Sequence, residues 1–394
     1  METQTQFFRD TWAEINLDYL TENIKNIKQH IASEEVKMFA VVKANAYGHG
    51  DVQVALTALE AGAHGLAVAF LDEAISLRKG GVEAPILVLG ATRSMDVKLA
   101  SSHNISLTTF GMEWLEEAAE ELDQTSSLNL HIKCDTGMGR IGVRSTEELK
   151  RMESFIQSSS KFNLEGIFTH YATADELDDA YLDQQLETFE EMLAVLDERP
   201  LYIHSSNSAA ALRKPKTHFN AVRVGIAMYG LSPSQEMKEV LPFPLKEVFS
   251  LHSRLIYAKE LEAGDKVSYG ATYESAGDEW IGTIPIGYAD GWLRKLQGQQ
   301  VIVDGKRCPI VGRICMDQCM VSLPGALKAG VKVTLIGHEA DEAVSIDEIA
   351  EKLETINYEI PCIISTRVPR IYIRNGRPAE VSNKLLSSGG EIKK

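Results

Sequence analysis

Roughly the first 240 residues alternate between short apolar runs and longer amphipathic, acid-rich stretches such as EWLEEAAEELDQ and LDQQLETFEEMLAVLDE. Apolar runs of this length, separated by helical stretches, predict βα units and a parallel sheet. Eight such units in about 250 residues are what a closed (β/α)8 barrel of the TIM type requires. An open doubly wound sheet is the alternative, and its dinucleotide-binding form is disfavoured because no GxGxxG follows the first run. The eight runs span residues 39–43, 65–69, 85–89, 105–110, 130–134, 164–170, 201–206 and 222–228.

The pattern changes at LPFPLKEV, whose prolines are typical of a linker. Beyond it, apolar and polar positions alternate in segments such as WIGTIPIGYADGW and QQVIVDGKRCPIVGRICMDQCMVSL, separated by glycine-rich turns. This alternation predicts a second, mostly β domain. We therefore expect an α/β fold with a barrel at residues 13–242 and a β-rich C-terminal domain at residues 243–394. Residues 1–12 are expected to form an N-terminal segment that pairs with the C-terminal domain.

Composition and charge narrow the class of protein. The chain is 44% hydrophobic and 24% charged, which is ordinary for a globular protein. Its formal net charge of −16 argues against a nucleic-acid partner, because phosphate contacts need a basic surface. No apolar run approaches the ~18 residues of a membrane span. The N-terminal METQTQFFRD lacks the features of a secretory signal, so we expect a cytoplasmic protein.

The cysteines indicate neither disulfides nor a metal. There are five of them, an odd number at irregular spacing, which argues against a disulfide framework. Cys315 and Cys319 lie four residues apart, but no other Cys or His pair of suitable spacing accompanies them. We therefore predict no metal.

Polar side chains follow several of the apolar runs. Lys43 ends the first run, Lys133 lies in the fifth, and His170 ends the sixth; residues 204–208 follow the seventh, and Arg223 lies in the eighth. Chemistry in a (β/α)8 barrel takes place at the C-terminal ends of the strands. The distribution predicts a binding site in the barrel mouth.

Two of these features point to one cofactor. A partly desolvated lysine at the mouth has a lowered pKa and is available for a Schiff base with an aldehyde, although a surface lysine is an equally supported reading of Lys43. In HSSNSAAAL, Ser208 and backbone N–H groups can hold an anion, which is compatible with an ordinary N-cap at Asn207 or Ser208. Gly225 lets the backbone approach a ligand closely. A lysine and a phosphate cradle together suggest pyridoxal 5'-phosphate.

Several blocks of the chain resemble one known family. AVVKANAYGHG is similar to the cofactor-lysine signature of alanine racemases. HIKCDTGMGRIGV, FNAVRVGIAMYGL, VSYGATY, IPIGYADGW, GRICMDQCMV and LETINYEI resemble further blocks of that family, in the family's order. The resemblance runs from TWAEI to STRVPRIY. It implies an isomerase that interconverts L-alanine and D-alanine on pyridoxal phosphate and supplies D-alanine for peptidoglycan.

The resemblance also implies two catalytic bases. Lys43 would bind the cofactor as a Schiff base and then act on one face of the substrate Cα, while Tyr269 would act on the opposite face. A tyrosine with an ordinary pKa of ~10 needs help to act as a base near neutrality. His170 and Arg223 resemble its hydrogen-bonded partners in the family. Arg223 also resembles the residue that faces the pyridine nitrogen, where a permanent donor would make the ring a weaker electron sink.

Further site residues are implied by the same blocks. Arg140 resembles a residue near the substrate carboxylate, which suits its bidentate fork, with a structural ion pair as the alternative. Lys133 resembles a lysine that is carbamylated in many members and pairs with that arginine. The remaining cofactor-binding residues are expected to be Tyr47, His170, Asn207, Ser208, Arg223, Gly225, Ile226 and Tyr358. The remaining substrate-binding residues are expected to be Tyr288, Met316 and Asp317.

In the family, the residues matching Tyr269, Tyr288 and Met316 reach the active site of the other subunit, so a homodimer with shared active sites is implied. An amino-acid decarboxylase is disfavoured because those enzymes place an acid, not Arg223, opposite the pyridine nitrogen. A pyridoxal-phosphate carrier is disfavoured because such proteins resemble the barrel alone. A racemase of another small amino acid such as serine remains the nearest alternative; the bulk of Tyr288, Tyr358 and Met316 favours alanine.

Overall fold

The computed structural model describes residues 7–33 and 35–387, which divide into two compact units. The barrel unit comprises the described residues of Leu20–Ala46 and Asp51–Lys246. The β unit comprises the described residues of Met1–Tyr19, Tyr47–Gly50 and Glu247–Lys394. Two short segments early in the chain are thus grouped with strands that come some 200 residues later, because they pair or pack with them.

Eight parallel strands close into a barrel, which confirms the predicted fold class and excludes the open sheet. Their residues are mostly apolar and buried, as expected when helices cover the outside of a parallel sheet and side chains fill its inside. Each strand coincides with one of the predicted apolar runs. The strands are β2 (Lys37–Val41), β3 (Gly65–Val68), β4 (Ile86–Val88), β5 (Ser106–Thr109), β6 (Leu128–Lys133), β7 (Phe162–Phe168), β8 (Tyr202–His204) and β9 (Ala221–Val224).

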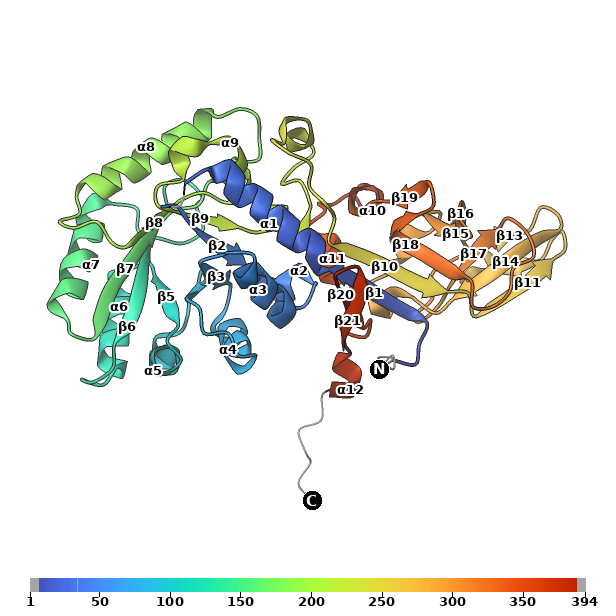
Figure 1. The fold of residues 1–394 in the computed structure, drawn as a ribbon, viewed down its shortest axis with the longest axis horizontal. Helices are drawn as coiled ribbons and strands as arrows, with labels where there is room; N and C mark the ends of the chain where they lie inside the picture. Colours follow the sequence, from blue (N-terminus) through green and yellow to red (C-terminus); the bar gives the residue numbers. More distant parts are fainter. Residues whose placement is uncertain (1–6, 34, 388–394) are drawn as a thin grey trace, which may run out of the picture. The chain divides into compact units, whose positions relative to one another are not determined.

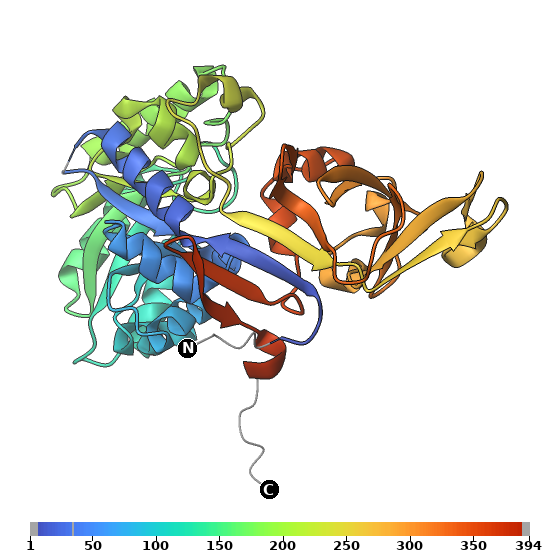
Figure 2. The same ribbon diagram turned by 45° about the vertical axis from the view of Figure 1, so that its right-hand side comes forward.

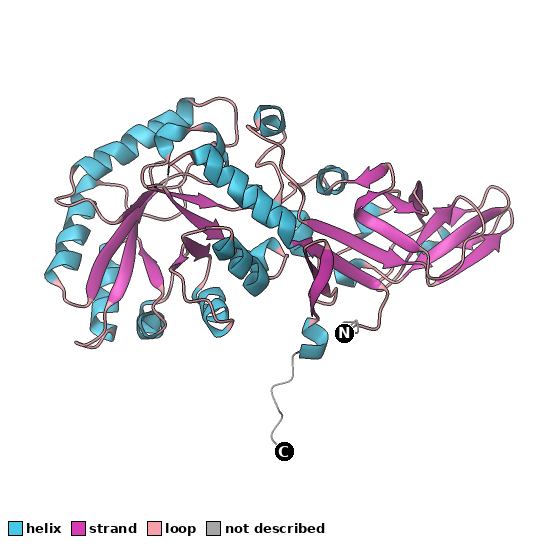
Figure 3. Cartoon of the chain, in the orientation of Figure 1, coloured by secondary structure: helices cyan, strands magenta, loops and turns pink. Residues whose placement is uncertain are grey.

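Amphipathic helices lie outside the barrel strands (Figures 1 and 3). Helix α7 is an example: Ser145 caps it by accepting from the Glu148 backbone N–H, and Leu149, Met152 and Ile156 form its buried face at helical spacing. The helices are α1 (Leu17–Ile31), α3 (Asp51–Glu60), α4 (Leu71–Lys79), α5 (Val97–Ser102), α6 (Met112–Glu121), α7 (Thr146–Ser158), α8 (Ala180–Ala194) and α9 (Ser208–Arg213). Short 3-10 turns complete the unit at η1 (Ser94–Asp96), η2 (Pro215–Thr217), η3 (Ile226–Tyr229) and η4 (Glu236–Val240).

The β unit is built on an eleven-stranded sheet and a separate two-stranded ribbon. Strand β1 (Thr11–Asn16) pairs antiparallel with β10 (Phe249–Arg254) and parallel with β20 (Arg370–Arg374), so it lies inside the sheet (Figure 2). The other sheet strands are β11 (Tyr257–Leu261), β14 (Glu279–Ile284), β15 (Gln300–Val303), β16 (Lys306–Val311), β17 (Cys319–Leu323), β18 (Lys332–Glu339), β19 (Glu342–Val344) and β21 (Arg377–Ser382). The ribbon pairs β12 (Lys266–Val267) with β13 (Tyr273–Glu274).

Short helices and turns connect these strands. They are η5 (Tyr269–Ala271), η6 (Tyr288–Asp290), η7 (Arg294–Leu296), α10 (Ile346–Leu353), α11 (Glu359–Ile363) and α12 (Lys384–Ser387). One buried side chain joins several of the segments: Arg370 donates to the backbone carbonyls of Gly48, Ile364, Ser365 and Val368 at 2.6–3.1 Å. Because the Arg370 side chain satisfies carbonyls that water cannot reach, it holds the segment at Gly48 to the end of α11 and the start of β20.

We predict that Arg370→Met lowers the free energy of unfolding by about 3 kcal/mol, because several buried carbonyls lose their donor. The measurement is chemical denaturation of the purified protein. The control is Arg377→Met on the exposed face of β21, which should change the free energy by less than about 0.5 kcal/mol. Equal effects of the two substitutions would contradict the structural role of Arg370.

Candidate active site

Lys43 lies two residues beyond the end of β2 and is half-buried. It opens the segment α2 (Lys43–Tyr47), in which Ala44, Asn45, Ala46 and Tyr47 all have φ of +52° to +53°. This left-handed conformation costs residues with a Cβ roughly 1–2 kcal/mol each. Four consecutive strained residues beside a candidate catalytic lysine indicate a functional turn, because the surrounding structure must maintain it.

Two side chains of the barrel unit hold the backbone on either side of Lys43. The Glu73 carboxylate, in the first turn of α4, accepts from the backbone N–H of Ala44 at 2.6 Å and of Ala69 at 2.8 Å. The Tyr229 hydroxyl donates to the carbonyl of Val41 at 3.0 Å. The sequence gives no sign of this role for Glu73, since nothing distinguishes it from an ordinary acid in the first turn of a helix.

A polar cradle forms where β8 meets α9 and β9 meets η3. Asn207 Oδ1 accepts from the Ala210 N–H at 3.0 Å, which confirms the N-cap predicted there. The buried Ser208 Oγ accepts from the backbone N–H groups of Gly225 at 2.9 Å and Ala227 at 3.4 Å. In the described part of the chain no acceptor takes the Ser208 hydroxyl proton, so it can donate to an anion. Asn207, Ser208, Gly225 and Ile226 are thus brought together as predicted.

The buried guanidinium of Arg223 lies beside this cradle, in β9. Its Nη1 donates to Nδ1 of His204 at 2.7 Å and to the His204 carbonyl. Its Nη2 faces the carbonyls of Thr169 and Ser205 and Nδ1 of His170, at 2.8–3.2 Å. All of these acceptors are neutral. Among residues 7–33 and 35–387, none accepts from Nε, so that this N–H can donate to a ligand.

Three further basic groups surround Arg223. Lys133 is buried at the end of β6, with Nζ 4.4 Å from the ring centroid of Phe168 and no hydrogen-bond partner among the described residues. Burial, then the charges of Arg223 and Arg140, hold the pKa of Lys133 well below its ordinary value. The pKa of His170 is likewise well below its ordinary value, through burial and the charge of Lys133.

No carboxylate compensates this basic cluster within hydrogen-bond distance, in the part of the chain that the structure describes. Arg140 is exposed and forms no ion pair there, so the structural ion pair considered as an alternative is not observed. Burial lowers the pKa of Arg223 to about 9, which still leaves it protonated at neutral pH. Uncompensated buried charge is unfavourable. The barrel mouth therefore fits an anionic ligand.

The other predicted residues belong to the β unit. Tyr269, at the start of η5, is 71% exposed, and Met316 is 52% exposed. Tyr288 begins η6, and its N–H donates to the Cys315 carbonyl at 3.0 Å, next to Met316. A Cβ at Gly287 would lie 2.3 Å from that carbonyl, so only glycine permits this approach of the two loops.

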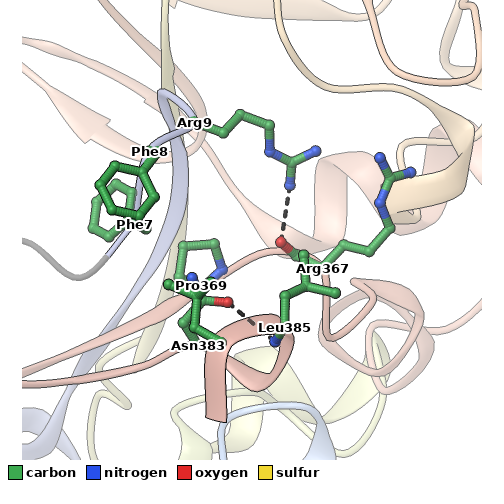
Figure 4. Close-up of a pocket in the computed structure, with 8 residues that line it drawn as sticks. Phe7, Phe8, Arg9, Arg367, Pro369, Asn383 and Leu385 are labelled. Carbon is green, nitrogen blue, oxygen red and sulfur yellow. Dashed lines mark hydrogen bonds between the residues drawn. The ribbon is translucent and has the colours of Figure 1, made fainter. Parts of the chain in front are cut away.

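Two more contacts position predicted residues of the β unit. The Tyr47 and Tyr358 rings lie 6.2 Å apart between centroids, and burial raises the pKa of Tyr47. Asp317 forms an ion pair with Arg367 at 2.7 Å. Arg367 also lines a separate pocket with Phe7 and Leu385, where its carbonyl accepts from Arg9 Nη2 (Figure 4). That pocket is lined by apolar side chains together with Arg9, Arg367 and Asn383, and it includes none of the predicted site residues.

Comparison with known proteins bears on the class of this protein. The family described as "Alanine racemase, N-terminal domain" matches residues 15–233, and "Alanine racemase, C-terminal domain" matches residues 248–372. The chain is 58% identical to an alanine racemase of Geobacillus stearothermophilus, over 96% of this chain and 97% of the relative. It matches the crystal structure of alanine racemase from Bacillus anthracis with bound L-Ala-P at a TM-score of 0.94 and 51% identity, covering 97% of this chain and 100% of the other.

A relative with another name is more distant. The histidine racemase of Leuconostoc mesenteroides subsp. sake matches at a TM-score of 0.89 and 32% identity, covering 93% of this chain and 98% of the other. The barrel, the β domain and these matches define the chain as an enzyme of the isomerase class. It belongs to the alanine racemase family.

The described residues include neither a membrane-spanning helix nor a cluster of metal ligands. Helices there are too short or too polar to cross a membrane. His, Cys, Asp and Glu side chains within the same residues form no group of three that could hold a metal ion.

We predict that Ser208→Ala lowers the free energy of unfolding of the cofactor-free protein by about 2 kcal/mol, because two buried N–H groups lose an acceptor. Denaturant titration measures the change. Ser154→Ala, on the exposed face of α7, is the control and should have an effect of less than about 0.5 kcal/mol. A stability as high as that of the control would mean that Ser208 Oγ does not order the cradle.

Proposed function

We propose that this protein interconverts L-alanine and D-alanine by a two-base mechanism with pyridoxal 5'-phosphate as cofactor, and supplies D-alanine for peptidoglycan. The observation that carries the proposal is the combination of Lys43, on a strained turn, with buried basic groups that have no carboxylate partner among the described residues. An amine, an anion cradle and a buried donor arginine match the aldehyde, the phosphate and the ring nitrogen of this cofactor. The names of the relatives support alanine as the substrate.

The residues present would divide the work of binding. Ser208, Gly225 and Ile226 would hold the phosphate, together with Tyr47 and Tyr358. Arg223 would donate its Nε–H to the pyridine nitrogen. When bound, the cofactor supplies an electron-withdrawing ring that acidifies the Cα–H bond of an attached amino acid.

Two side chains, one on each face of the substrate Cα, would transfer the proton. Lys43 Nζ would exchange the Cα proton on one face, and Tyr269 Oη would exchange it on the other, so that removal from one side and return to the other inverts the centre. The 71% exposure of Tyr269 is consistent with a role in the barrel mouth of a partner chain. We therefore propose a homodimer with two shared active sites, which would act in the cytoplasm.

Five residues would form the substrate-binding part of the site: Arg140, Lys133, Tyr288, Met316 and Asp317. Arg140 would bind its carboxylate through the planar fork of the guanidinium. Only an uncharged amine reacts with carbon dioxide, so the depressed pKa of Lys133 favours its carbamylation, and the carbamate would pair with Arg140. Tyr288, Tyr358 and Met316 would limit the side chain to one of about the size of methyl.

The first test is racemisation. We expect the wild-type protein loaded with pyridoxal phosphate to reduce the circular dichroism of L-alanine to zero, and Lys43→Ala to leave the signal unchanged because it removes one base. L-Serine and L-histidine are compared in the same assay and should react more slowly, since their side chains are larger. Faster loss of the signal with either would reassign the substrate; cofactor binding without any loss would reject a racemase.

The second test concerns the shared site. Lys43→Ala and Tyr269→Phe should each be inactive alone, but the dimer population formed when the two are co-expressed should recover about a quarter of wild-type activity. Half of the dimers are then mixed, and each of these keeps one intact site. Tagged co-expression and measurement of the racemisation rate provide the test. No recovery in dimers shown to be mixed would place both bases in one chain.

A further inference from the structure

A line of hydrogen bonds runs from Arg223 through the barrel interior to a carboxylate. Nη1 of Arg223 bonds to Nδ1 of His204 at 2.7 Å, and Nε2 of His204 bonds to Nδ1 of His131 at 2.9 Å. Nε2 of His131 then bonds to Oε2 of Glu165 at 3.1 Å. The four residues come from β9, β8, β6 and β7. We call them the Arg223–Glu165 chain.

The two ends of this chain determine the protons between them. A guanidinium can only donate, and an ionised carboxylate can only accept. Nδ1 of His204 must therefore accept from Arg223, which places its proton on Nε2. That proton is donated to Nδ1 of His131, so the His131 proton also lies on Nε2 and is donated to Glu165. Both imidazoles are restricted to one tautomer, and every bond points the same way.

Glu165 is built to remain an acceptor. Its carboxylate accepts from Ser106 Oγ at 2.5 Å and from Asn129 Nδ2 at 3.1 Å, in addition to His131. Burial raises the pKa of Glu165, but the hydrogen bonds from His131 and Ser106 outweigh it and hold the pKa below its ordinary value. Burial also lowers the pKa of His131 and that of His204, so both rings stay neutral.

The strands make room for the chain. The pairing register of β6 and β7 shifts at Leu130 and His131, and His131 comes opposite Gly166. A Cβ at Gly166 would lie 2.3 Å from Nδ1 of His131, so no residue but glycine fits without displacing the ring. A bulge of this kind re-aims a side chain. Here the bulge and the glycine together admit His131 to the chain.

Aromatic rings enclose both histidines. Phe168 stacks on His204 at 4.7 Å between centroids with an interplanar angle of 9°, and Tyr202 stacks on His131 at 5.8 Å and 16°. Phe39 contacts Tyr202 and His204. Exclusion of water strengthens each hydrogen bond and allows consecutive bonds to polarise one another.

We propose that His204, His131 and Glu165 are positioning residues for Arg223: the carboxylate orients both imidazoles so that the guanidinium is anchored through Nη1 and keeps Nε free for its ligand. None of the three touches the ligand. The identification of that ligand as the cofactor's pyridine nitrogen rests on the proposed function. The direction of the hydrogen bonds in the Arg223–Glu165 chain does not depend on it.

Glu165→Gln is the most informative substitution, because glutamine keeps the shape of the side chain but can donate a hydrogen bond as well as accept one. A glutamine amide can donate to Nε2 of His131, which permits the reversed chain, with a proton on Nδ1 of His204 facing the Arg223 donor. Glu153→Gln is the matched control: Glu153 is a buried carboxylate of the barrel unit, whereas Glu165 is half-buried, and it accepts from Lys150 Nζ and the Asp197 N–H and is not joined to Arg223. Thermal unfolding establishes that both variants fold.

The readout is the tautomer of each histidine, measured by ¹⁵N NMR on the cofactor-free protein with labelled histidine and assigned with His131→Asn and His204→Asn. We expect protons on Nε2 of both rings in the wild type and in Glu153→Gln, and mixed tautomers in Glu165→Gln. A proton on Nδ1 of either ring in the wild type would overturn the proposed direction of the hydrogen bonds. Unchanged tautomers in Glu165→Gln would mean that Arg223 alone orients the rings and would overturn the positioning role of Glu165.

Kinetics of the loaded protein supply the second readout. In Glu165→Gln, kcat for racemisation should fall about tenfold while KM changes less than about twofold, because a small misplacement of a binding group slows the reaction more than it weakens binding. Wild-type kcat despite mixed tautomers would overturn the positioning role. If the wild type does not racemise any amino acid, the proposed function fails. The NMR result then still decides whether the Arg223–Glu165 chain orients Arg223.

Discussion

The burial of the Arg223 guanidinium without a carboxylate beside it is the constraint on which the barrel mouth depends. A buried charge is tolerated only when its hydrogen bonds are satisfied. Four of the five N–H groups of Arg223 belong to Nη1 and Nη2, and strands β7 and β8 with the residues after them supply carbonyls and imidazole nitrogens for these groups. The same arrangement makes the region basic, because Arg140 adds charge, the buried amine of Lys133 adds a second basic group, and the described residues offer no acid at hydrogen-bond distance. An anionic ligand would complete this balance, and the phosphate of the proposed pyridoxal phosphate cofactor would supply one.

Backbone strain is concentrated at the other side of the candidate site. Four consecutive residues after Lys43 adopt the left-handed conformation, at a cost that only surrounding contacts can offset. Glu73 and Tyr229 supply such contacts in the barrel unit. In the β unit, Gly48 and Gly50 continue the turn with positive φ, and a Cβ at Gly48 would lie 2.0 Å from the Pro361 carbonyl. The AYGHG sequence is therefore required for close backbone packing as well as for the turn that begins at Lys43.

The predicted site residues are distributed over both units of the chain. The group in the barrel unit is organised by the hydrogen bond between Arg223 and His170, by the bond from the Gly225 N–H to Ser208 Oγ, and by the mutual effect of the basic side chains on their pKa values. The group in the β unit is organised by backbone contacts between the loops of Tyr288 and Met316. Tyr269 is exposed, which agrees with the proposal, drawn from the family resemblance, that it acts in the site of a partner chain.

The sequence alone determined the architecture and predicted most of the residues of the candidate site. Apolar runs at regular intervals indicate parallel strands that are buried on both faces, and their number predicts a closed barrel. Short motifs such as AVVKANAYGHG show where a lysine leaves a strand. The sequence could not show Glu73, Gly166 or the connection of Glu165 to Arg223, since these residues are ordinary in their own segments. Their roles depend on strands 30 to 60 residues apart meeting in register inside a closed barrel. Only the tertiary structure decides which donors and acceptors face one another, because a hydrogen bond requires an approach of about 3 Å that no local pattern encodes.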